Sequence, residues 1–239
     1  MPRPNLASRG IGESEKRGAK RVPPSPGRRA ARAPRPGQEN ARAIALEILR
    51  RVEATDAYAN LLVDSRLQRS RLSGPDRALV TELVYGVLRW RGKLDWILAP
   101  VLDRPVDTLD SPVRQVLRLG AYQLCCLTRI PDFAAVDETV SLARRTGGAR
   151  HASYVNAVLR AVARSRIRPE PDPASDPVGY WKTVGSHPGW LVERWIARLG
   201  ADEAGGLMAA NNAVPPVTVL ANPLKARDEE VRQALEKAG

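Results

Sequence analysis

The chain has 239 residues, with 38 Lys and Arg against 26 Asp and Glu, giving a formal charge of +12. That length fits one large or two small domains, and the pI near 10.5 is typical of nucleic-acid binders. No stretch approaches the roughly 18 apolar residues that span a bilayer, and the N-terminus lacks the apolar core of a signal peptide. Cys125 and Cys126 are neighbours, so we expect a cytoplasmic protein with no membrane contact and no disulfide partner.

Residues 1–38 form a basic leader. They hold ten Lys or Arg and two Glu, which is eight of the twelve net positive charges, together with seven prolines. Such a composition buries too little apolar surface to offset the entropy of ordering, so the leader is predicted to be disordered. Two interpretations stay open, a solvated tail without a specific function and a non-specific phosphate-binding arm.

Residues 39–165 read as one all-α domain. Helices are expected at about 39–52, 59–69, 76–98, 111–125, 134–145 and 151–164, because apolar residues recur there at helical spacing and no period-two stretch interrupts them. Ser73 and Asp76 form a capping pattern at the start of the long helix, which continues or kinks at Gly92. Gly120 in mid-helix predicts a close helix approach. Cys125 and Cys126 are interpreted as small buried side chains.

The chain changes character after that domain. Residues 166–188 hold five prolines and are expected to be a linker. Residues 189–239 then predict a partial α+β module, with helices near 190–199, 202–210 and 228–237 and one strand over 217–220. A single strand cannot form a stable sheet. Its partners must therefore lie in another chain, or the sequence is the N-terminal part of a longer protein.

Cations gather at several helix ends and suggest an RNA surface, since phosphates need cations and unstacked bases need planar groups. Each one could equally be a solvated surface charge, and the tryptophans Trp90, Trp96, Trp190 and Trp195 favour core packing over base stacking. His187 is expected to cap the following helix. The candidate RNA-binding residues are Arg42, Arg50, Arg51, Arg89, Arg91, Lys93, Arg144, Arg145, Arg150, His151 and Arg160.

No catalytic residue and no metal site is predicted. The two histidines and two adjacent cysteines offer no metal-ligand spacing, and no histidine lies near the cysteines in the sequence to activate a thiol.

Several stretches carry a family resemblance. The segments AIALEILRRVE, AYANLLVD, PDRALVTELVYGVLRWRGKLDWIL, VRQVLRLGAYQL, AAVDETVSLAR and YVNAVLRAV resemble the NusB-like helical RNA-binding domain. Downstream, SHPGWLVERWIARLG and NNAVPPVTVLANPLKARDEEVRQALEKAG are similar to the second module of RsmB-type (Sun-type) enzymes. Those enzymes are S-adenosylmethionine-dependent cytosine-5 methyltransferases that act on small-subunit ribosomal RNA.

The resemblance implies a mainly α chain, a NusB-like bundle followed by the start of a small α+β RNA-binding module. It implies S-adenosylmethionine for the full-length parent and none for this chain, because the Rossmann-like catalytic domain of the family should follow Gly239 and no glycine-rich loop after a strand occurs here. We therefore expect no methyl transfer by this chain alone. Leu220 stands where the family's strand usually carries an arginine, which weakens an RNA role for that strand.

Three functions follow as hypotheses. The first is the RNA-recognising N-terminal part of an rRNA cytosine-5 methyltransferase. The second is a free-standing RNA-binding or transcription-antitermination protein, which would work with a ribosomal or transcription-complex protein. The third is a helical protein–protein adaptor, for which RNA affinity would vanish once residues 1–38 are removed.

Overall fold

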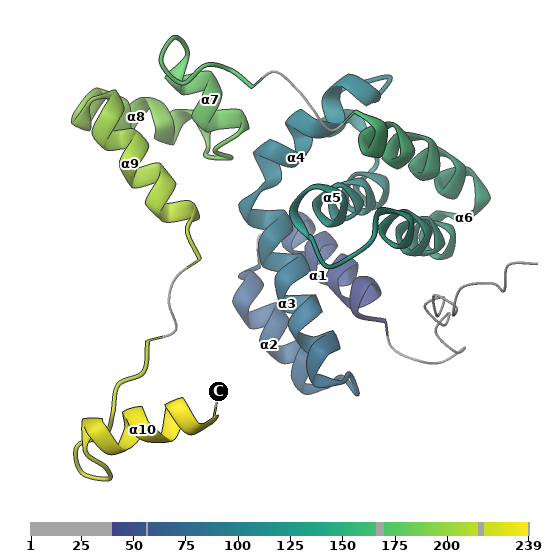
Figure 1. Cartoon of the computed structure of the whole chain (residues 1–239). Coiled ribbons are helices and arrows are strands. Elements are labelled where there is room, and N and C mark those ends of the chain that lie inside the picture. The colour runs from purple at the N-terminus through teal and green to yellow at the C-terminus, as the bar shows by residue number, and fades with distance from the viewer. Residues whose placement is uncertain (1–39, 56, 166–169, 215–217, 239) are drawn as a thin grey trace, which may run out of the picture. The chain divides into compact units, whose positions relative to one another are not determined.

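The computed structural model describes residues 40–55, 57–165, 170–214 and 218–238 (Figure 1). The regular structure in these ranges is entirely helical, as expected for a mainly α chain, and none of their residues is in a strand. The leader, predicted to be disordered, lies outside the described residues. One continuous apolar core spans the helices from residue 41 to residue 162.

The first three helices follow the apolar periodicity of the sequence. They are α1 (Ala41–Thr55), α2 (Ala59–Gln68) and α3 (Gly74–Arg89), and the predicted apolar stripe of α1 is buried. At the start of α3 the Ser73 hydroxyl oxygen accepts from the Asp76 amide at 3.4 Å, so the predicted cap is confirmed. This bond satisfies one of the amide donors that a helix start leaves unpaired.

The long central helix expected over 76–98 is broken, although not at the predicted glycine. It ends at Trp90, whose φ of −98° and ψ of 20° are not helical, and α4 (Arg91–Leu98) begins directly afterwards. Short 3-10 turns at Ala99–Val101 and Val106–Thr108 then lead to α5 (Ser111–Cys126). Helix α5 contacts α1, α3, α4 and α6 (Asp132–Arg164), so it lies at the centre of the bundle.

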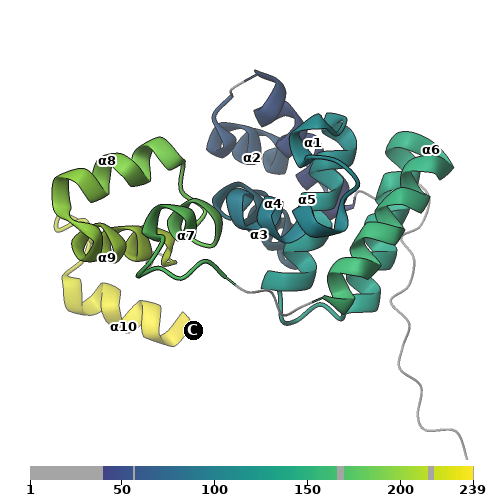
Figure 2. The same cartoon turned by 90° about the horizontal axis from the view of Figure 1, so that it is seen from above.

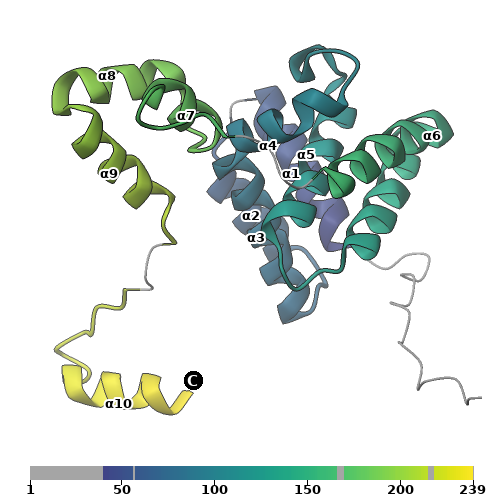
Figure 3. The same ribbon diagram turned by 45° about the horizontal axis from the view of Figure 1, so that its top comes forward.

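Helix α6 is two helices joined at a bend. Gly148 has φ 75° and ψ −168°, backbone angles that are essentially restricted to glycine, so the helix break expected between 145 and 151 is present there. The chain doubles back there, and both halves of α6 lie on the same side of the bundle (Figure 3). Apolar residues of both halves, among them Leu142 and Leu159, are buried in the core.

The close helix approach predicted at Gly120 is present in α5. A Cβ built there would lie 2.6 Å from Leu159 Cδ1 and 3.0 Å from Thr139 Cγ2, one on each half of α6. We expect Gly120→Ala to lower the free energy of unfolding by about 1–2 kcal/mol, because one more methyl group overpacks the interface. Gly206→Ala in α9 (Ala201–Asn212) is the control, since a Cβ built there would meet no atom within 4 Å outside its own stretch of helix. Urea unfolding should show the control unchanged or stabilised by about 0.5–1 kcal/mol. A stabilised Gly120→Ala would contradict the steric account.

A network of charged groups ties α5 to α1 and α4. The Arg118 guanidinium donates to both carboxylate oxygens of Asp95, at 2.7 and 2.8 Å, and lies 3.5 Å from Glu53 Oε1. Arg114 Nε and the Ser111 hydroxyl also donate to the Glu53 carboxylate. Burial acts to raise the pKa of Glu53, but hydrogen bonds from Ser111 and Arg114 outweigh it, so the pKa is lowered. Glu53 is therefore held ionised.

The chain after residue 170 contains a further helical group, α7 (Pro177–Thr183), α8 (Gly189–Leu199) and α9 (Ala201–Asn212) (Figure 2). Their core is Val192, Ala204 and Met208. The segment 166–188 is thus not linker throughout, because the Asp176 carboxylate accepts from the Gly179 amide at 2.8 Å and caps α7. Pro177 is the first residue of that helix, a position where proline favours a helix start and does not interrupt the helix.

The predicted strand is not formed in the described residues. Residues 218–220 have no regular structure, and Val217 lies outside the described part of the chain. With no second strand among the described residues, its β-branched pattern has nothing to pair with. Leu220 and Leu224 are 95% and 94% exposed, and α10 (Asp228–Ala238) follows them.

Three smaller expectations were wrong. Cys125 is exposed, although Cys126 is half-buried. His187 caps no helix, and its ring nitrogen Nδ1 lies 2.8 Å from the Gly185 carbonyl. Trp190 is 64% exposed, because its place in the first turn of α8 points it away from the small core of α7 to α9.

Candidate nucleic-acid interface

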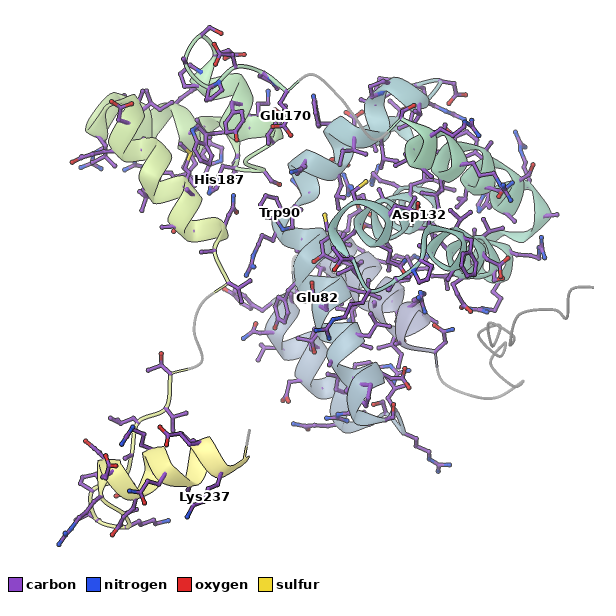
Figure 4. All side chains as sticks on the ribbon, viewed as in Figure 1. Glu82, Trp90, Asp132, Glu170, His187 and Lys237 are labelled. Carbon is purple, nitrogen blue, oxygen red and sulfur yellow. The ribbon has the colours of Figure 1, made fainter. Side chains whose placement is uncertain are left out.

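The α3–α4 junction carries one group of predicted cations. Trp90 ends α3 and precedes α4, so Arg89, Arg91 and Lys93 are held within one turn of a helix boundary (Figure 4). Arg91 is exposed, whereas Arg89 and Lys93 are half-buried. Lys93 Nζ lies 5.5 Å from the centre of the Trp90 ring, within the range of a cation–π contact. This contact covers one face of the indole. Trp90 therefore helps to hold the junction together, and that face is not open for base stacking.

Two titratable groups of α5 lie near this junction. The Tyr122 hydroxyl donates to Glu82 Oε1 at 2.5 Å, and burial together with the Glu82 carboxylate raises the pKa of Tyr122. Burial and the neighbouring Cys125 raise the pKa of Cys126 to about 11. The Cys126 thiol is therefore protonated at neutral pH, and it lacks the thiolate character that a nucleophile needs.

The bend of α6 carries a dense group of exposed cations. Arg144, Arg145 and Arg150 are exposed and flank Gly148 in the sequence, while His151 is half-buried. All three arginines belong to the helix turns next to one bend, which places three positive charges on a short stretch of surface. An array of this kind suits a phosphate backbone, because each cation can replace a condensed counterion.

The second half of α6 extends this group into a pocket. Arg150 and His151 line it together with Arg104 and Tyr154, and the Tyr154 hydroxyl donates to Asp103 Oδ1 at 2.9 Å. Arg104 was missed by the sequence reasoning because it lies in an irregular loop, far from residue 150 in the chain. The only signal for it was an isolated cation between Pro100 and Pro105.

The cations of α1 separate into two kinds. Arg50 and Arg51 are exposed and adjacent, as expected for a basic surface. Arg42 is half-buried, and its Nε donates to the Gln123 side chain at 2.6 Å. Burial lowers the pKa of Arg42, although the negative charges of Glu138 and Asp76 act to raise it. Its guanidinium thus joins α1 to α5, so a contact with RNA would use its remaining donors.

Arg160 lies apart from the bend group, in the last turns of α6. Its Nε donates to Asn156 Oδ1 at 2.9 Å, which supplies the partner that an amide inside a helix needs. The structure thus groups Arg89, Arg91 and Lys93 at the α3–α4 junction, and Arg144, Arg145, Arg150 and His151 at the α6 bend. It leaves Arg42 and Arg160 in separate surroundings.

No group of three potential metal-ligating side chains occurs in the part of the chain that the structure describes. Over the same residues, no helix has the length and apolarity to cross a bilayer.

The fold and its surface define an all-α bundle with basic helix junctions, followed by a second helical group. The NusB family model matches residues 39–164, more than half of the chain, and the chain belongs to the NusB family. A second model, for the ferredoxin-like domain of RsmF/B-like methyltransferases, matches residues 187–239.

Relatives match most of the chain in sequence. A Bacillus subtilis (strain 168) protein named "Probable ribosomal RNA small subunit methyltransferase B" is 38% identical over 198 residues, covering 83% of this chain and 44% of the relative. The Escherichia coli O1:K1 / APEC "Ribosomal RNA small subunit methyltransferase B" is 30% identical over 203 residues, covering 84% of this chain and 45% of the relative. The chain therefore spans less than half the length of these relatives.

A solved structure shows the same fold at lower identity. PH0851 aligns with 84% of this chain and 45% of its own, with a TM-score of 0.58 and 18% identity. At that identity the likeness establishes the fold alone.

Proposed function

We propose that these 239 residues are the RNA-recognising part of a cytoplasmic S-adenosylmethionine-dependent methyltransferase that modifies cytosine C5 in small-subunit ribosomal RNA. The observation that carries this proposal is the match of a NusB-family module and an RsmF/B-like module in that order. The names of the relatives support the substrate class. The second module favours this function over a free-standing antitermination protein. A protein partner from the ribosome or the transcription complex stays a prediction.

Substrate capture is the step that this chain's own residues can perform. Arg144, Arg145 and Arg150 at the α6 bend, with Arg91 at the α3–α4 junction, are exposed and positioned to contact phosphates. S-adenosylmethionine would supply the methyl group. The described residues contain no strand leading into a glycine-rich loop, so they do not fit that cofactor and no methyl-transfer step is derived from them.

The test is the salt dependence of RNA binding by the chain. Affinity for small-subunit rRNA fragments should fall linearly on a log–log salt plot, by about 0.7 in slope for each single-strand phosphate contact. The measurement should also be made on residues 40–239, because the adaptor hypothesis places all affinity in the leader. Binding that is insensitive to salt, or that disappears without the leader, would overturn the proposal.

A further inference from the structure

A surface pocket of about 390 Å³ lies where the two ends of α6 meet. Residues from the first two turns of α6 form one wall, and residues from its last turns form the other. Val136, Val140 and Ala163 supply its apolar lining. Phe133, the single phenylalanine of the chain, lines the rim and is 66% exposed. An aromatic ring exposed to this extent contributes little to the core and leaves its face open to a ligand.

The two walls carry opposite charge. All the acids of α6, including Asp132 and Asp137, lie in its first two turns, while its arginines all follow residue 143. Because the chain doubles back at Gly148, the acidic start meets Arg160 and Arg164 across the pocket. Figure 4 marks Asp132 at the start of the helix. The pocket is thus cationic on one side and anionic on the other.

The cationic wall is partly preorganised. Asn156 accepts from Arg160 Nε at 2.9 Å, which orients the guanidinium while leaving its terminal nitrogens to other partners. Arg164 is exposed in the last turn of α6 and lines the same wall. Two guanidinium groups on one wall match the geometry of a phosphate, which arginine binds through paired donors.

We propose that this pocket takes one unpaired RNA base that carries an exocyclic amine, such as cytosine. The base stacks on Phe133, its backbone phosphate contacts Arg160 and Arg164, and its amine donates to the Asp137 carboxylate. This assignment rests on the RNA binding proposed above and names a subsite within it.

The combination of groups favours a nucleotide over a peptide. A nucleotide has an anion at one end, a flat ring in the middle and, in cytosine, a hydrogen-bond donor at the far edge. The pocket offers cations on one wall, and an exposed aromatic ring together with a carboxylate on the other. Stacking of splayed bases on aromatic side chains and acceptance from cytosine N4 by Asp are both established modes of recognition.

The experiment compares binding of labelled single-stranded oligocytidine and oligouridine to the full 239-residue chain by fluorescence anisotropy. The wild-type chain should prefer oligocytidine by about fivefold or more, since uracil has no amine to donate to Asp137. Phe133→Ala should weaken both complexes by roughly 5- to 100-fold through loss of stacking, and Phe133→Tyr should retain binding. Asp137→Ala, which removes the acceptor for the amine, should abolish the preference without weakening oligouridine binding, whereas an asparagine amide oxygen at this position would still accept from cytosine. Leu61→Ala, at a side chain that is 63% exposed on α2, is the control for loss of surface apolar area.

The outcomes separate this subsite from the wider function. If Phe133→Ala and Asp137→Ala both behave as wild type while loss of the bend arginines still weakens binding, the subsite is overturned and the RNA function stands. If the chain binds neither oligonucleotide nor rRNA fragments, both proposals fall.

Discussion

Replacing Arg118 by alanine is expected to lower the free energy of unfolding by about 3–5 kcal/mol, the largest stability effect anticipated for a single side chain here. The Arg118 side chain is 7% exposed, and its two bonds to Asp95, at 2.7 and 2.8 Å, are the closest ion-pair contacts in the buried network. Removing the guanidinium leaves the Asp95 carboxylate, itself only 24% exposed, without that partner. The Glu53 carboxylate is less affected, because it keeps its ion pair with Arg114, whose Nη2 lies 2.9 Å from Glu53 Oε1.

Urea unfolding followed by far-ultraviolet circular dichroism measures this effect, and Arg232→Ala is the matched control. Arg232 pairs with Glu229 and Glu236 on α10, and its side chain is 63% exposed. Water screens such surface pairs, so the control should leave the midpoint of unfolding essentially unchanged. Equal losses in the two variants would mean that burial does not determine the strength of the Arg118 network.

Neutralising the bend of α6 should give the largest loss of RNA affinity. We expect the combined variant Arg144→Gln, Arg145→Gln and Arg150→Gln to bind rRNA fragments about a hundredfold more weakly at moderate salt. Three lost phosphate contacts should also reduce the slope of the log–log salt plot by roughly 2. All three side chains are exposed, so the fold should be unaffected.

The control for that variant removes the same charge elsewhere. Arg69→Gln, Arg71→Gln and Arg129→Gln also replace three exposed cations of the same bundle, and none of them is among the candidate RNA-binding residues. Both variants weaken the long-range attraction of a polyanion equally, so a difference between their salt slopes reports local contacts. Identical slopes would show that net charge, and not the bend, accounts for binding.

The helical architecture was predictable because apolar periodicity and capping are local properties of a sequence. The Ser73 cap, the stop at Gly148 and the close approach at Gly120 were each predicted from residue type and position. The wrong predictions concern features that depend on partners. The strand over 217–220 needed a second strand, and the position of the α3–α4 break depended on packing around Trp90.

The candidate site was less predictable, since it depends on which distant segments meet. Clusters that are contiguous in sequence, such as Arg144 and Arg145, could be proposed from the chain alone. The neighbours Arg104 and Arg150, and the pair Phe133 and Arg160, come together only after the chain folds. Arg42 could not be recognised as a link to Gln123 for the same reason. The role of every predicted cation in RNA binding stays a prediction.

Because the two halves of α6 are joined directly at Gly148, the number of residues between them cannot change without turning one half relative to the other. Each added or deleted residue turns a helix by about 100°. One insertion next to the bend would therefore rotate Val155, Leu159 and Val162 out of the interior and carry polar neighbours into it. Variation among related chains should consequently occur there as substitution of side chains, with the number of residues between the two halves held constant.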